Sequence, residues 1–164
     1  MTTGDFGPGA PGYGGYPLPA APARRPGRLG RRFLARLIDG VVVEVAALVL
    51  SVFVFDDSYP FLVTGLFSGV LTFGYFVLFE TAQGATPAKR LLGLAVRGPD
   101  GVSKPTIAQS ALRNAFTLLA TLVPYLGGLV AFVAYVVIAV TIGSSPTKQG
   151  KHDELAGGTR VIRD

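Results

Sequence analysis

The sequence contains no cysteine and no tryptophan, and it has a single histidine among 164 residues. The lack of cysteine excludes disulfides, thiolate zinc sites and cysteine nucleophiles. With one histidine, histidine-rich metal sites and most general-base arrangements lack their side chains. We therefore expect neither an enzyme nor a chain that carries a metal or another cofactor.

Charged residues are also scarce, at 15% of the sequence against 49% hydrophobic residues. An ordinary soluble domain contains about 25% charged residues. The 15 lysines and arginines exceed the 10 acids, which gives a net charge of +5. Because the apolar content is so high, the sequence favours a lipid bilayer over nucleic acid as the partner of this basic chain.

Residues 1–27 differ from the rest in composition, since seven glycines and six prolines occur there. Such a segment buries too little apolar surface to offset the entropy lost on ordering. We predict a disordered cytoplasmic tail, with the alternative that it docks a partner protein. The arginine-rich stretch at 24–36 is predicted to contact anionic lipid.

The remainder, 28–164, is predicted to be an all-α membrane domain with three or four transmembrane helices. Two apolar runs, 33–55 and 61–80, are long enough to cross a bilayer. A third, 106–143, is too long for one crossing, and turn residues at its centre favour two short arms, 106–123 and 129–143. A single tilted crossing, or arms that enter the bilayer without crossing it, are the alternatives.

The basic residues predict the orientation of these helices. They lie in three blocks, within 24–36, 89–113 and 148–163, whereas the loop at 56–60 has two aspartates and no basic residue. Positive residues remain in the cytoplasm. The N-terminus, the 80–105 segment and, for a hairpin, the C-terminus are thus cytoplasmic, in a multi-pass protein of the plasma membrane. Two short cytoplasmic strands, at 91–97 and 158–162, are predicted to pair.

Three ionisable residues of the first span, Arg36, Asp39 and Glu44, are expensive to place in lipid and are typical of function. Arg36 and Asp39 are three residues apart and can pair on a helix. Glu44 lies about 140° further round the helix than Asp39, so it needs another partner or a wet cavity. The alternative for Arg32, Arg36 and Asp39 is that they reach the interface at the end of the span.

Small residues four apart, Gly65 and Gly69, form a GxxxG pattern in the second span. Such residues let two helix backbones approach closely in lipid. We favour packing within one chain over a contact between two copies.

Several motifs occur in a fixed order. Arg32 opens a run that ends in Ile38 and Asp39, and a later His152-Asp153 pair precedes Gly158-Thr159. On the basis of these motifs, the sequence resembles the RDD family of small bacterial membrane proteins over about residues 28–164. That family carries Gly at the position of Ala88. The other matching residues here are Gly84, Thr86, Lys89, Arg90, Arg113 and Asn114.

The resemblance implies a multi-pass membrane protein, and some family members are linked to the exchange of monovalent cations for protons. On that implication Asp39 and Glu44 would carry the proton or cation, tuned by Arg32 or Arg36. Asp153 would form a cytoplasmic charge cluster with Lys89 and Arg90, as a latch rather than a gate. A homo-oligomer is implied for transport, and a non-transporting adaptor that recruits partners through its tail and strands is the alternative.

Overall fold

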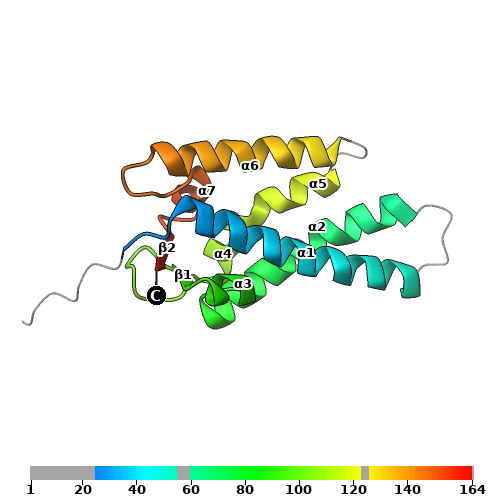
Figure 1. Cartoon of the computed structure of the whole chain (residues 1–164), viewed down its shortest axis with the longest axis horizontal. Helices are drawn as coiled ribbons and strands as arrows, with labels where there is room; N and C mark the ends of the chain where they lie inside the picture. Colours follow the sequence, from blue (N-terminus) through cyan, green and yellow to red (C-terminus); the bar gives the residue numbers. More distant parts are fainter. Residues whose placement is uncertain (1–24, 55–59, 123–125, 164) are drawn as a thin grey trace, which may run out of the picture.

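In the computed structural model, residues 25–54, 60–122 and 126–163 are described. The first two helices, α1 (Leu29–Val54) and α2 (Pro60–Gln83), are long and pack against each other. A second pair follows later in the chain, formed by a broken helical arm at 107–122 and by α6 (Gly127–Ser144). Figure 1 shows that the end of α1, the start of α2, the end of α5 and the start of α6 lie at the same end of the molecule. From there α6 returns toward the start of α1.

The broken arm consists of α4 (Ile107–Asn114), the 3₁₀ turn η1 (Ala115–Leu118) and α5 (Leu119–Leu122). It begins at Thr106, whose hydroxyl accepts from the backbone N–H of Gln109 while the Gln109 side chain accepts from the backbone N–H of Thr106. Such a reciprocal cap satisfies two amide donors at a helix start. The predicted span at 106–123 is therefore helical, but it is not one regular α-helix.

The opposite end of the molecule carries the short elements. These are α3 (Pro87–Leu91), β1 (Leu94–Arg97), α7 (Lys151–Leu155) and β2 (Arg160–Arg163). The two strands pair antiparallel, with Leu94 opposite Arg163 and Val96 opposite Val161. The predicted strand pair is confirmed, although β1 begins later than predicted because 87–91 forms a helix with Thr86 as its N-cap and Pro87 at its first turn.

The N-terminal boundary of the ordered domain differs from the predicted one. Residues 1–24 of the predicted tail lie outside the described part, but 25–27 run alongside β2. Pro26 bridges to Ile162, and the Gly27 amide donates to the Val161 carbonyl at 3.0 Å. The prediction that 25–27 belong to a disordered tail is wrong, because β2 offers unpaired edge groups that a short glycine- and proline-containing segment can satisfy.

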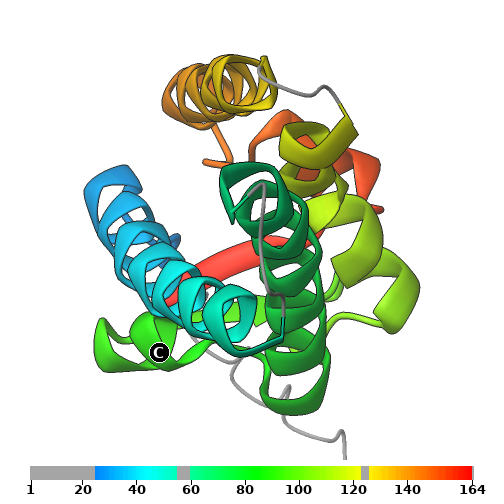
Figure 2. The ribbon, with the colours of Figure 1, turned by 90° about the vertical axis from the view of Figure 1, so that its right-hand side faces the viewer.

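The elements surround a small apolar core and leave much apolar surface outside. Ala35, Ala88, Leu94, Val96 and Val161 form the buried cluster between α1, α3 and the sheet. Figure 2 looks along the helices: α2 lies between α1 and the α4–α5 arm, and α6 lies to one side. Among the described residues one helix, α6, is long and apolar enough to span a membrane, with a mean hydropathy of 2.1 and only 11% of it buried.

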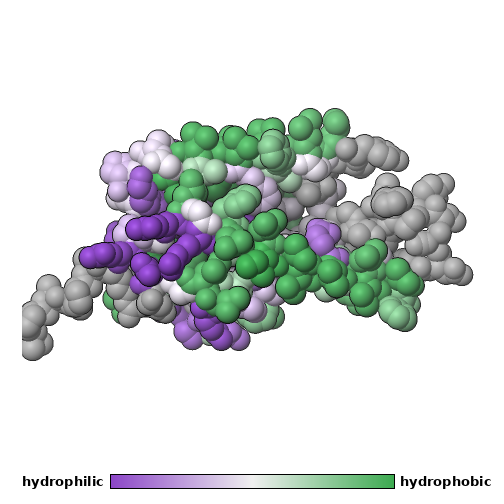
Figure 3. Space-filling view, in the orientation of Figure 1, coloured by the Kyte–Doolittle hydropathy of each residue, from purple (hydrophilic) through white to green (hydrophobic). Residues whose placement is uncertain are grey.

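The exposed surface is divided between the two ends. Figure 3 shows hydrophobic side chains over α6 and α1, and hydrophilic ones gathered at the end that carries the sheet. Phe33, Val52, Phe53 and Phe132 are each more than 60% exposed. An apolar patch of this extent on an isolated chain marks a surface that meets lipid or another protein.

Gly69 packs within the chain. It is buried, and a Cβ built on it would overlap Cγ2 of Thr121 in α5 and lie 3.5 Å from the Thr117 carbonyl oxygen. This glycine thus permits the close approach of α2 to the second pair of helices. The side-chain surroundings of Gly65 lie outside the described residues.

Candidate functional site

Beside its apolar core, the interior near the sheet holds many polar groups. Buried carboxylates need basic partners or several hydrogen-bond donors, because an unpaired charge is costly in low dielectric. The three carboxylates buried there have different kinds of partner. The buried polar residues of this end are Asp39, Glu80, Thr86, Lys89, Ser110, Arg113, Asn114, Asp153 and Thr159.

Asp39 of α1 is held by neutral donors. Its Oδ1 accepts from the Tyr75 hydroxyl at 2.7 Å and from the Ala88 amide at 3.2 Å, and its Oδ2 accepts from the Thr86 hydroxyl. Only 1% of Asp39 is exposed. Within the described ranges, Asp39 has no ion pair with Arg32, Arg36 or any other basic residue, so the predicted pairing with Arg36 is wrong.

Glu80, near the end of α2, is held by cations and amides. Its Oε1 accepts from the Lys89 ammonium, while its Oε2 accepts from Ser110 Oγ and Asn114 Nδ2, each at 3.0 Å. The Arg113 Nε lies 3.7 Å from the same Oε2. Glu80 therefore ties α2 to both α3 and α4.

Asp153 of α7 is the third buried carboxylate. Arg113 Nη1 lies 2.8 Å from its Oδ1, and Arg32 Nη1 lies 3.6 Å from its Oδ2. Its Oδ2 also accepts from the Gly150 amide at 3.3 Å, which caps α7. Of the three predicted family-motif residues, Arg32 and Asp153 meet, whereas Asp39 lies in a separate set of contacts.

Arg32 and Arg113 connect these groups. Arg113 is 3% exposed and lies between Glu80 and Asp153. The Arg32 side chain is 9% exposed and also donates to the carbonyls of Gly27 and Val161, at 3.0 and 2.9 Å. Because Arg32 turns inward, the alternative that it reaches toward the membrane interface is not what the structure shows.

Lys89 and Arg90 are neighbours with different surroundings. Lys89 is buried against Glu80, whereas Arg90 is exposed and donates to Gln83. Burial lowers the pKa of Lys89 to about 8 against the opposing Glu80 carboxylate, with a further lowering by Arg113 and Arg36. The predicted cluster of Asp153 with Lys89 and Arg90 is wrong in its partners, because Asp153 pairs with Arg113 and Arg32 instead.

The single histidine lies beside Asp153. His152 Nε2 is 3.5 Å from Asp153 Oδ1, and the ring stands edge-on to Phe116 with 5.9 Å between centroids. Burial lowers the pKa of His152 to about 3, although Asp153 favours the protonated form. The ring is therefore neutral at pH 7.

Arg36 and Glu44, the other predicted charges of the first span, have neutral partners. Arg36 Nη1 donates to Asn114 Oδ1 at 3.0 Å, and its guanidinium carbon lies 3.8 Å from the centre of the Phe76 ring. Glu44 accepts from the Ser68 hydroxyl of α2. The expectation that Glu44 does not share a face with Asp39 agrees with these separate partners.

Gly84 and Ala88 differ in their backbone conformation and in the space around them. Gly84 ends α2 with φ +71°, and a Cβ there would lie 2.6 Å from Arg97 Nη1, so glycine is required. Ala88 lies inside α3 and is not among the described residues with positive φ. Its difference from the family glycine therefore costs no backbone strain, and its amide still reaches Asp39.

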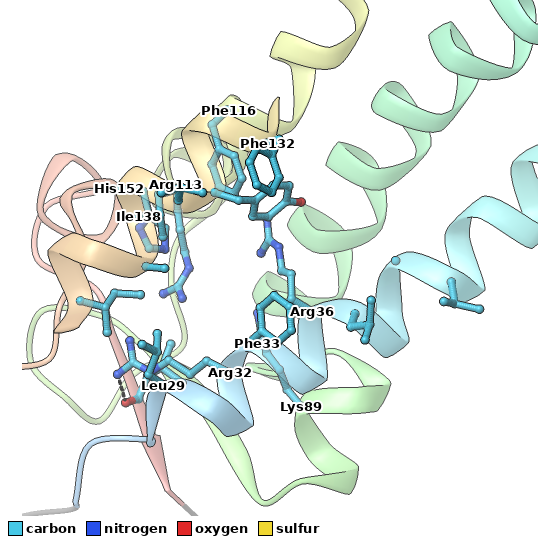
Figure 4. A pocket seen from close by; sticks show the side chains of 18 of the residues that line it. Leu29, Arg32, Phe33, Arg36, Lys89, Arg113, Phe116, Phe132, Ile138 and His152 are labelled. Carbon is cyan, nitrogen blue, oxygen red and sulfur yellow. Dashed lines mark hydrogen bonds between the residues drawn. The ribbon is translucent and has the colours of Figure 1, made fainter. Parts of the chain in front are cut away.

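A pocket of about 680 Å³ lies between α1 and α6. Figure 4 shows Arg32, Arg36 and Arg113 around one end of it, with His152 beside Arg113. Phe33, Leu37, Val41, Phe132 and Val136 supply apolar walls. Asp39, Glu80 and Asp153 do not line it.

Some residues of this site belong to no sequence motif that would have predicted their role. Tyr75 and Ser110 reach Asp39 and Glu80 only because α2 and α4 pack as they do. Glu80 could have been found from the sequence, since it is the first charged residue after an uncharged run of 19 residues, 61–79. A lone acid at the end of such a run indicates a buried group that needs a basic partner.

Comparison with known proteins gives one match. The model of the RDD family matches residues 26–157 of the chain. No curated protein and no solved structure matches the chain.

Proposed function

Because the chain belongs to the RDD family, which points to a membrane protein, we propose that it is a multi-pass protein of the plasma membrane that exchanges protons for small cations. The proposal is for a transporter and not for an enzyme. One observation carries it: Asp39 is a buried carboxylate with no basic partner among the described residues.

The multi-pass arrangement is supported by the distribution of charge along the molecule. The end of α1, the start of α2 and the start of α6 lie at one end, and the sheet and α7 lie at the other (Figure 1). The basic residues that follow α2 and α6 belong to the end with the sheet. By the positive-inside rule this end is cytoplasmic, and so are both termini.

Proton exchange needs a carboxylate that can gain and lose a proton. Glu80 and Asp153 do not suit this role, because each already forms ion pairs with basic groups that balance its charge. Asp39 is held by the hydroxyls of Tyr75 and Thr86 and by one amide, all of which are neutral. A proton or a small cation at Asp39 would supply the positive charge that its surroundings lack.

Glu44 is the second proposed carrier. It lies one and a half turns beyond Asp39 on α1, lines the pocket and is bonded to Ser68. The network of Lys89, Glu80, Arg113 and Asp153 is proposed as the latch that holds the cytoplasmic end together. Because so few helices can enclose only a narrow pathway across the membrane, we propose a homo-oligomer as the transporting unit.

The test is reconstitution into vesicles that contain a pH-sensitive dye. After sodium, potassium or lithium is added outside, the wild type should change the internal pH, and Asp39→Asn should abolish that change. Glu44→Gln should reduce it. The exposed Glu154, paired with Lys151 on the surface, provides the matched control Glu154→Gln, which should transport normally.

Absence of cation-driven proton flux in the wild type would overturn the transporter proposal and leave the adaptor alternative. Normal flux in Asp39→Asn would overturn the role of Asp39. The topology is tested separately with a reporter fused to the C-terminus that is active only outside the cytoplasm. We expect no signal from it, and a signal would overturn the hairpin.

A further inference from the structure

The pocket between α1 and α6 has one charged end and one apolar end. Leu37, Val41 and Val45 of α1 face Phe132 and Val136 of α6 across it. These apolar residues are between 44% and 64% exposed, so the pocket opens at the surface between the two helices. For a protein in a bilayer, such an opening faces lipid.

The charged end holds two Arg36 donors that have no acceptor among the described residues. Within the described part of the chain, Arg36 Nε and Nη2 are buried and make no hydrogen bond. Arg32 Nη1 and Arg113 Nε are also buried, and they lie 3.6 and 3.7 Å from the carboxylates of Asp153 and Glu80. The Arg113 side chain is 96% buried and the Arg32 side chain 91% buried. Buried donors in native proteins nearly always have a partner, so the two Arg36 nitrogens indicate an absent acceptor.

The charges at this end do not balance. Four cations, Lys89 and three arginines, line the pocket. The described carboxylates that line it or form ion pairs with these cations are three, Glu44, Glu80 and Asp153. Arg36 has an amide and aromatic rings as its described partners. Positive charge that exceeds the nearby carboxylates, in a low-dielectric pocket, is stabilised by an anion.

We propose that this pocket binds one anionic phospholipid. Its phosphate accepts from Arg36 and Arg113 at the charged end, and one acyl chain lies between α1 and α6. Arginine forks match the oxygens of a phosphate, and basic pockets between membrane helices bind acidic headgroups. The apolar walls distinguish this occupant from a free phosphate ion, which would gain nothing from them.

Two matched pairs of variants test the two ends of the pocket. Arg36→Gln removes a cation that forms no ion pair with a described residue, and Arg31→Gln removes an exposed one from the same helix outside the pocket. Val136→Trp fills the apolar part, and Val133→Trp places the same side chain on α6 outside it. Both valines are exposed, so neither substitution disturbs the core.

The measurement is native mass spectrometry of the purified chain after exchange into phosphatidylglycerol, phosphatidylcholine or lipid-free micelles with inorganic phosphate. We expect one phosphatidylglycerol to remain bound to the wild type, with at least tenfold less phosphatidylcholine. Loss of one charged contact in Arg36→Gln should weaken phosphatidylglycerol binding about tenfold. Val136→Trp should abolish retention, while both control variants should resemble the wild type.

Three outcomes would overturn the proposal. Equal retention of the two phospholipids would show that the pocket does not distinguish an anionic headgroup from a zwitterionic one. Equal losses in Arg31→Gln and Arg36→Gln would assign binding to the basic flank and not to the pocket. Inorganic phosphate binding that survives Val136→Trp, without lipid retention, would show a free-anion site.

Discussion

The Arg113 guanidinium in α4 lies 2.8 Å from the Asp153 carboxylate in α7, although 40 residues separate them in the chain. Both side chains are buried, and Arg113 also approaches Glu80 of α2. One arginine therefore joins three helices at the end of the molecule that carries the sheet. Removing it would leave two buried carboxylates with fewer partners.

Arg113→Met should destabilise the fold by about 3–5 kcal/mol, because breaking a buried ion pair from one side leaves uncompensated charge. The free energy of unfolding in detergent, measured with denaturant, checks this. Arg160→Met changes an exposed arginine of β2 and is the control. Equal effects of the two substitutions would contradict the linking role of Arg113.

Gly69→Ala should destabilise the packing of α2 on α5 by about 1–3 kcal/mol, because the new methyl group overlaps Thr121. Thr121→Ala removes the overlapping methyl and should restore much of the loss in the double variant. Gly74→Ala is the control, since nothing lies within 4 Å of a Cβ at that position in the same helix. Thermal unfolding of the four variants measures the effect. An unchanged unfolding temperature in Gly69→Ala would refute the close approach of α2 to α5.

Thr86→Val should destabilise the protein by about 1.5–3 kcal/mol, the usual range for a hydrogen bond to a charged group. Valine has the same shape, but it cannot donate to Asp39 or cap α3. Thr81→Val is the control, because Thr81 donates only to carbonyls of its own helix. Denaturant unfolding compares the two, and a smaller loss in Thr86→Val than in Thr81→Val would contradict the prediction.

The protein should lose stability in mild acid through His152. Its pKa is 6.5 for the unfolded chain and about 3 when folded, so only the unfolded chain takes up a proton between these values. The stabilising contribution is complete above pH 6.5 and decreases by at most about 1.4 kcal/mol per pH unit below it. His152→Gln should flatten that slope in unfolding experiments from pH 8 to 4. An unchanged slope would show that the histidine is protonated in the folded state.

Much of the fold follows from local properties of the sequence. The apolar runs at 33–55 and 61–80 determine where α1 and α2 form, since their length and period favour helices in any apolar surroundings. The alternating residues around Val161 and the turn residues after Arg97 similarly predicted the two strands. Short helices such as α3 and α7 gave weaker signals, because five residues are too few for a periodic pattern.

The charged residues show the limit of such reasoning. Arg36 and Asp39 are spaced for a pair along one helix, yet Arg36 contacts Asn114 and Phe76 while Asp39 contacts Tyr75 and Thr86. The partners of a buried charge are fixed by which helices pack together. That is a property of distant contacts and not of spacing along the chain.

The sequence by itself determined that this protein is apolar, basic and helical, and that a few ionisable residues lie within its apolar runs, because composition and period act locally. Only the tertiary structure decided that Arg32, Arg113 and Asp153 meet, and that Asp39 remains without a basic partner among the described residues. The physical reason is that burial forces each charge to find an acceptor or donor within a few ångströms. The packing of α1, α2, α4 and α7 supplies those partners.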